Sequence, residues 1–164
     1  MDGARVIVNL DSLQQLAMKY PQAAANASRA RITQAVMLLE AAIKRITPVG
    51  AGPVHMRDTI FSRVQMDGES VWGMIATPVK YGQPVEYGTR PHFPPVKTIQ
   101  FWVEKKLGYT GKQAKSVAFL IARAISRRGT QAREPFGRGF EEQRSQVVWI
   151  LSQIPADIVK AVHA

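Results

Sequence analysis

Hydrophobic residues recur at helical spacing in several stretches of the chain. In the clearest, from about residue 28 to residue 46, apolar positions follow at steps of three and four: Ile32, Val36, Leu39, Ile43 and Ile46. This spacing forms one apolar stripe and predicts a helix that Pro48 ends. Similar patterns predict helices at about 11–20, 99–107, 112–128 and 140–162, the last kinked or divided at Pro155.

The predicted ends and faces of these helices rest on particular residues. Gly108 and Gly129 follow the two middle helices and are expected to end them. The first of these helices places Ile99, Trp102, Val103 and Lys106 on one side.

Two strand-like runs, at 59–66 and 70–77, flank an Asp67-Gly68 pair that is typical of a hairpin turn. A short strand is also expected at about 6–10. Residues 81–95 hold several prolines and glycines, and no regular element is expected there. Residues 129–139 are expected to form a polar loop. These elements predict an α+β fold in one domain over 1–164: a small antiparallel sheet packed by helices, with a C-terminal helix and a basic helical insertion at about 90–131.

The net charge of +10 is concentrated in one part of the chain, because residues 80–138 carry 12 Lys and Arg against 3 acidic residues. Such a segment favours an acidic partner, either nucleic acid or an acidic protein surface, although a solvated face is an alternative. On the helix at 112–128, helical geometry groups four cations around Phe119: Lys112, Lys115, Arg123 and Arg127. No helix-turn-helix, RNA-recognition or zinc-finger signature surrounds them, which favours Phe119 packing on a neighbouring subunit over a nucleic-acid-binding module.

The residues that carry catalysis or bind metals are sparse. The chain has no cysteine, which excludes disulfides, a thiolate nucleophile and Cys-ligated zinc. Its histidines, at positions 55, 92 and 163, are scattered and predict no metal site. Glu141 and Glu142 are adjacent, so on a helix they diverge by about 100° and do not form an acid–base pair. We therefore expect a protein that is not an enzyme and has no cofactor.

No apolar stretch approaches the ~20 residues of a membrane helix, and the first residues do not read as a signal peptide. We therefore expect neither a membrane partner nor export.

Three landmarks occur in a fixed order along the chain. The first comprises Thr-Pro-Val-Gly at 47–50 and Met-Arg-Asp-Thr-Ile at 56–60; the second is Tyr-Gly-Gln-Pro-Val-Glu-Tyr-Gly-Thr at 81–89. The third is Glu-Pro-Phe at 134–136, followed by Phe-Glu-Glu at 140–142. In this order the landmarks resemble the minor tail-component family of long-tailed bacteriophages, whose members are tail-completion or neck proteins at the head–tail junction. The loop after residue 50 is longer here, and residues 90–131 extend beyond the shortest members.

The resemblance implies a structural virion protein, assembled as a ring or ring-associated subunit that completes the tail and joins it to the head. It implies a homohexameric ring at the neck, formed in the host cytoplasm, with tail-tube, terminator and head-connector proteins as partners and a possible non-specific contact with genomic DNA. A tail terminator ring is the alternative within this class, and a basic nucleic-acid-binding module is the alternative from another class.

Several landmark residues have expected structural roles. Glu86 is expected near an edge or a subunit contact, where it accepts backbone N–H bonds or pairs with an arginine from a neighbour. Gly88 is expected at a positive φ. Pro135 and Phe136 are expected to fix a turn and anchor the last helix. The expected interface and structural residues are Glu86, Tyr87, Gly88, Thr89, Phe119, Pro135 and Phe136.

Overall fold

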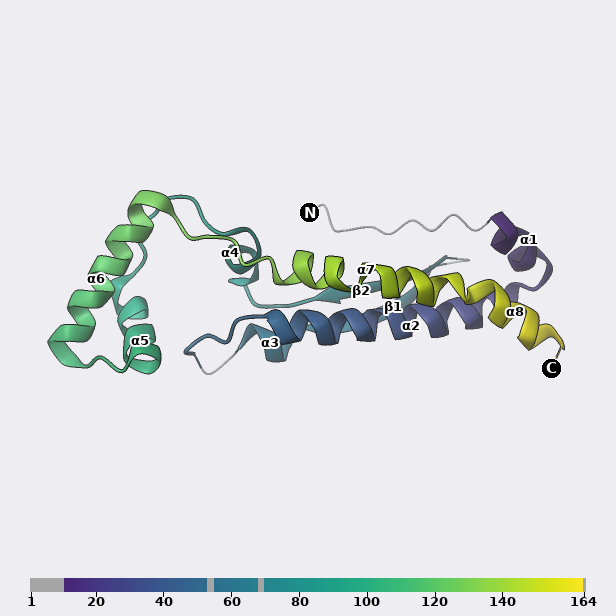
Figure 1. Cartoon of the computed structure of the whole chain (residues 1–164), viewed down its shortest axis with the longest axis horizontal. Coiled ribbons are helices and arrows are strands. Elements are labelled where there is room, and N and C mark those ends of the chain that lie inside the picture. The colour runs from purple at the N-terminus through teal and green to yellow at the C-terminus, as the bar shows by residue number, and fades with distance from the viewer. Residues whose placement is uncertain (1–10, 53–54, 68–69, 164) are drawn as a thin grey trace. The chain divides into compact units, whose positions relative to one another are not determined.

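The computed structural model describes residues 11–52, 55–67 and 70–163 (Figure 1). The strand expected at 6–10 and Gly68 of the expected turn lie outside these residues. The elements, in chain order, are α1 (Asp11–Lys19), α2 (Pro21–Ile46), α3 (Met56–Thr59), β1 (Phe61–Asp67), β2 (Ser70–Ala76), α4 (Gly82–Tyr87), α5 (Val96–Leu107), α6 (Gly111–Arg128), α7 (Pro135–Ser152) and α8 (Ile154–His163). Helices predominate beside one two-stranded antiparallel sheet, so the predicted α+β class is confirmed.

The chain divides into two compact units. The first, which we call the sheet unit, comprises the described residues up to Ile46, residues 60–76 and the chain from Gly137 onward. The second, which we call the basic unit, comprises Thr47–Thr59 and Thr77–Phe136, and therefore contains the expected insertion at 90–131.

In the sheet unit, α2 covers one face of the β1–β2 hairpin (Figure 1). The pairing of Val64 with Gly73 places both on the face toward α2. A Cβ added at Gly73 would come within 3.0 Å of Ile32 Cγ2, and closer still to Val36. Because glycine has no Cβ, the backbone of β2 approaches α2 closely at this point.

The core of the sheet unit is built on alanines of α2. Ala24 and Ala27 pack with Ile154 and Ile158 of α8. About two turns further along, Ala35 and Leu39 of α2 pack with α7 through two buried aliphatic side chains, Val147 and Ile150. Small side chains on α2 let the helices approach closely, as interior packing requires.

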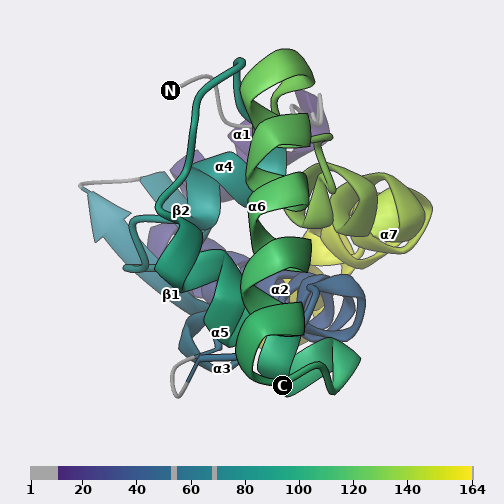
Figure 2. The same cartoon turned by 90° about the vertical axis from the view of Figure 1, so that its left-hand side faces the viewer.

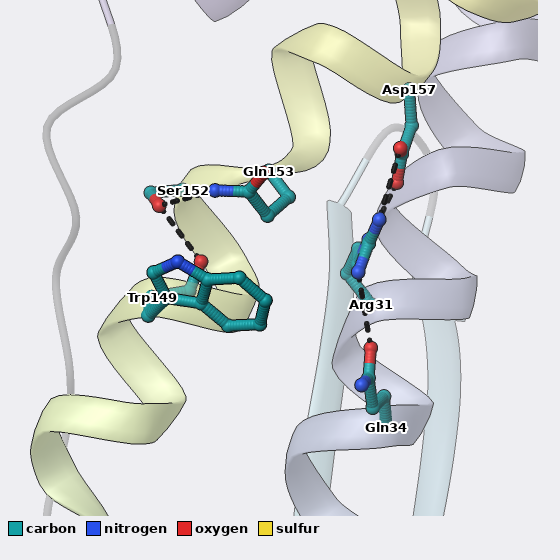
Figure 3. Close-up of polar contacts among 6 residues, drawn as sticks. All are labelled: Arg31, Gln34, Trp149, Ser152, Gln153 and Asp157. Carbon is teal, nitrogen blue, oxygen red and sulfur yellow. Dashed lines mark hydrogen bonds and ion pairs between the residues drawn. The ribbon is translucent and has the colours of Figure 1, made fainter.

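An ion pair links α2 to α8 (Figure 3). Arg31 Nε donates to Asp157 Oδ2 at 2.5 Å, and Arg31 Nη2 donates to Oδ1 at 3.0 Å. Arg31 Nη1 also donates to Gln34 Oε1, which holds the guanidinium in place. The hydrogen bond from Arg31 holds the pKa of Asp157 below its ordinary value, because it stabilises the charged carboxylate.

Three expectations about element boundaries are wrong. In each case a proline occupies the first turn of a helix, a position that tolerates it. The helix predicted from about residue 28 begins at Pro21, the first residue of α2. The segment 81–95 contains α4, with Pro84 in its first turn, and α7 begins at Pro135, within the expected loop 129–139. The first-turn N–H groups have no partner inside a helix, so proline costs little there.

The remaining helix predictions are largely confirmed. α5 ends before Gly108 and α6 before Gly129, and both glycines have positive φ. α7 and α8 are divided just before Pro155. On α5, Trp102 is exposed while Val103, beside it, is fully buried.

We expect Gly139→Ala to lower the free energy of unfolding by about 1–2 kcal/mol. The added Cβ would lie 2.7 Å from Ile43 Cγ1 and 3.2 Å from the Ile43 backbone, so α2 and α7 must separate. This overpacking exceeds the gain in helix propensity of about 1 kcal/mol. Gly50→Ala, which meets nothing within 4 Å, is the matched control. Equal stability of Gly139→Ala and wild type in urea unfolding would contradict the close contact.

The ion pair of Asp157 predicts a pH-dependent stability. Because its pKa is lower in the folded state, the pair stabilises the fold above the unfolded pKa of about 3.9, and this stability is lost as pH falls through the folded pKa. Asp157→Asn should therefore be less stable than wild type at pH 7, with a difference that shrinks toward pH 2. Asp67→Asn, at an exposed position in β1, is the control. A difference that stays constant between pH 7 and pH 2 in urea unfolding would show that the charge pair is not its source.

Candidate functional site: the Glu86 joint

Glu86 is a buried carboxylate in α4, with 8% of its surface exposed. The short helix begins at Gly82, where an added Cβ would lie 3.1 Å from Thr77 Cγ2. This close packing fixes the start of α4 and directs Glu86, near its end, toward the interior of the basic unit. A buried carboxylate requires hydrogen-bond donors, because an unpartnered charge there costs several kcal/mol.

Glu86 binds the first turn of α7. Its Oε2 accepts the backbone N–H of Phe136 at 2.9 Å. Phe136 is the second residue of α7, so its N–H is one of the donors without a partner inside the helix. Glu86 thus acts as an N-cap supplied from a distant segment, and its negative charge also suits the positive end of the helix dipole.

Backbone hydrogen bonds join the same two segments. The N–H of Arg133 donates to the carbonyl of Val85 at 2.9 Å, and the N–H of Glu134 donates to the carbonyl of Glu86 at 3.2 Å. Pro135, between Glu134 and Phe136, is almost fully buried. We call residues 85–89 with 130–136 the Glu86 joint.

A two-way bridge between Thr89 and Thr130 completes the joint. Each backbone N–H donates to the other carbonyl, at 3.1 and 3.2 Å, and the two hydroxyl oxygens are 3.0 Å apart. Gly88 (φ 71°) and Gly129 (φ 72°) precede the two threonines, and a Cβ on either would collide with the opposite backbone. Both positions therefore require glycine. The bridge closes the segment that contains α5 and α6.

The first landmark packs beside α4. Met56 of α3 is 2% exposed, and its Cε would lie 3.8 Å from a Cβ added at Gly82. The Thr59 hydroxyl donates to the Met56 carbonyl and lies 2.9 Å from the Thr77 hydroxyl. The fold thus brings residues from all three landmarks into one region of the basic unit.

The expected site residues have different positions. The joint contains Glu86, Gly88, Thr89, Pro135 and Phe136, and the positive φ expected of Gly88 is confirmed. The expected acceptance of a backbone N–H by Glu86 is present, from Phe136. Tyr87 is 72% exposed, and Phe119 lies on α6, outside the joint.

Helix α6 lies alongside α5 and presents its other side to solvent (Figure 2). Ala114 and Ala118 are fully buried against Val103 of α5. Five exposed side chains occupy the opposite side of α6, which we call the basic face: Lys112, Lys115, Phe119, Arg123 and Arg127. Phe119 is 50% exposed and contacts Phe93, with ring centroids 6.2 Å apart. The predicted grouping of the four cations around Phe119 is confirmed.

Two other kinds of feature are absent from residues 11–52, 55–67 and 70–163. No group of three or more His, Cys, Asp or Glu side chains there is arranged to hold a metal ion. Within the same ranges, none of the helices is both long and apolar enough to span a bilayer.

The sequence analysis did not predict the second segment of the joint, residues 130–134. Thr130, Arg133 and Glu134 contribute backbone groups, which leave no trace in side-chain patterns. One signal was available: the dipeptide Gly-Thr occurs at 88–89 and again at 129–130. Each copy supplies one half of the bridge.

Comparison with known proteins adds no relative. No protein-family model matches the sequence, and neither a curated protein nor a solved structure is significantly similar to it.

We expect Glu86→Gln to lower the free energy of unfolding by about 1–3 kcal/mol, because it removes a charge-assisted hydrogen bond and places an amide donor in a buried site. Glu141→Gln is the matched control. Glu141 is exposed, and its ion pair with Arg144 is long, at 3.7 Å, so the pair contributes little to stability. Urea unfolding measures both. If Glu86→Gln has the same free energy of unfolding as wild type, as the control should, the carboxylate does not hold the joint.

Proposed function

We propose that this chain is a structural virion protein of a tailed bacteriophage that completes the tail and joins it to the head. One observation carries the proposal. The landmarks that resemble the minor tail-component family are far apart in sequence, but the second and third meet in the Glu86 joint, and Met56 and Thr59 of the first lie beside the start of α4. Residues that resemble a family motif and also support one another in space favour a shared structural role over chance similarity.

The sheet unit offers a surface for assembly. Register places Phe61, Trp72 and Met74 on the sheet face opposite α2, and Phe61 and Trp72 are 38% and 43% exposed. Within the described residues the sheet has only two strands, so each strand has one edge without a strand partner. A two-stranded sheet is marginal alone, and exposed edges and apolar faces favour association. We propose that neighbouring subunits of a ring meet here.

The proposed ring is homohexameric and lies at the neck of the virion, with tail-tube, terminator and head-connector proteins as neighbours. A ring that caps the tail tube, as a terminator does, uses the same subunit contact. The two roles differ only in which proteins meet the faces of the ring.

The ring is tested by its stoichiometry and its place in the virion. We expect the purified chain to form a closed oligomer in native mass spectrometry, and Trp72→Glu to reduce it to monomer. Trp149→Glu alters a comparably exposed tryptophan on α7 and should leave the oligomer intact. Electron microscopy of particles of the phage that encodes the chain should place the ring at the top of the tail.

Two results would contradict the proposal. One is a location inside the capsid or at the distal tail tip. The other is a chain that stays monomeric at high concentration and is absent from virions.

A further inference from the structure

Nearly all the charged side chains in the segment that links the two halves of the Glu86 joint are cations. Residues 88–133 contain ten Lys and Arg and a single acidic residue, Glu104. The carboxylate of Glu104 accepts a hydrogen bond from Gln100 on α5. Glu104 therefore already has a hydrogen-bond partner, and in the described residues none of the ten cations forms an ion pair with it.

Ion pairs in the described residues are confined to the sheet unit. They join Arg31 to Asp157, Lys44 to Glu40, Arg45 to Glu142 and Arg144 to Glu141. Across the described part of the basic unit, no cation of residues 88–133 lies in an ion pair. Ten like charges in one segment repel one another, and a polyanion would relieve this repulsion.

A second copy of the chain is a poor source of that negative charge. Each copy carries a net charge of +10, so a second copy brings no surplus of negative charge. Of the acidic side chains that the structure describes, four lie in the ion pairs above and Glu86 is buried. The others are dispersed over the chain: Asp58, Asp67, Glu104 and Glu134. The partner is therefore a different molecule with a high density of negative charge.

The geometry of α6 favours duplex nucleic acid. Lys112 and Arg127 are 15 residues apart on one straight helix, about 22 Å at 1.5 Å per residue. Their side of the helix is convex and exposed, and the major groove of DNA admits an α-helix. Single strands are instead held in grooves that follow the backbone. We propose that the basic face of α6 binds the phosphate backbone of duplex DNA without reading its sequence.

Phe119 distinguishes this partner from a single strand. Unpaired bases would stack on its exposed ring, and loss of that ring would cost affinity. Phosphate contacts involve only the four cations, so Phe119→Ala should leave duplex affinity within about twofold of wild type.

The test measures fluorescence anisotropy of a labelled 30-base-pair duplex of random sequence with the purified full-length chain. The test variant changes Lys112, Lys115, Arg123 and Arg127 together to Gln. All four positions are exposed, and Gln has a favourable helix propensity. The control variant removes the same number of charges from exposed positions of the sheet unit: Lys19, Arg29, Arg138 and Lys160. Circular dichroism verifies that both variants fold.

The proposal expects wild type to bind the duplex at 50 mM salt, with log affinity falling against log salt at a slope near −3.6, about 0.9 for each phosphate contact. The test variant should lose at least tenfold in affinity and most of this slope. The control variant should stay within about threefold of wild type. Duplexes of different sequence should bind alike.

Four results would overturn it. The first two are the absence of duplex binding at 50 mM salt and an equal loss of duplex affinity in the two variants. The others are tenfold tighter binding of a single strand of the same length, and displacement of DNA by polyglutamate of equal charge as effectively as by unlabelled duplex. The last would assign the face to an acidic protein. The inference goes beyond the proposed ring, and its assay scores neither oligomer nor virion, so either proposal can fail alone.

Discussion

The burial of one carboxylate organises the basic unit. The Glu86 carboxylate is almost removed from water, so it must receive hydrogen bonds where it lies. The donor is the first turn of α7, which itself needs an acceptor. Each group satisfies the other, and the start of α7 is thereby fixed to the end of α4. The Thr89–Thr130 bridge then follows at the next residues, because Gly88 and Gly129 allow the two backbones to approach.

The sheet unit depends on a different constraint, the close approach of helices and sheet to α2. Alanines on α2, Gly73 on β2 and Gly139 on α7 leave room where larger side chains would collide. The Arg31–Asp157 pair then fixes the position of α8 along α2. The two units differ in their charges: the sheet unit combines apolar packing with paired charges, whereas in the described part of the basic unit the cations lie in no ion pair and backbone hydrogen bonds close the Glu86 joint. This contrast is the physical ground for assigning assembly to one unit and DNA contact to the other.

Periodicity and breakers predicted most helices and the hairpin, because both depend on local patterns. The stripe from Ile32 to Ile46, the stop at Gly108 and the division before Pro155 are of this kind. Proline as a helix start was misread at Pro21 and Pro135, since a breaker and a first-turn residue look alike in sequence. The capping of α7 by Glu86 could not be predicted in detail, because 50 residues separate donor and acceptor. The basic face of α6 was predictable from helical geometry; the absence of ion pairs around it, in the described part of the basic unit, required the structure.

The central claim is that Glu86 holds the first turn of α7 and thereby brings the second and third landmark segments together. Amide hydrogen exchange followed by NMR tests it most directly, at Arg133 and Phe136, whose N–H groups donate to Val85 and Glu86. The account predicts that both amides exchange slowly in wild type, and that in Glu86→Gln the amide of Phe136 exchanges faster while amides in the middle of α7 are unchanged. Exchange of both wild-type amides at the rate of an unstructured peptide would contradict it.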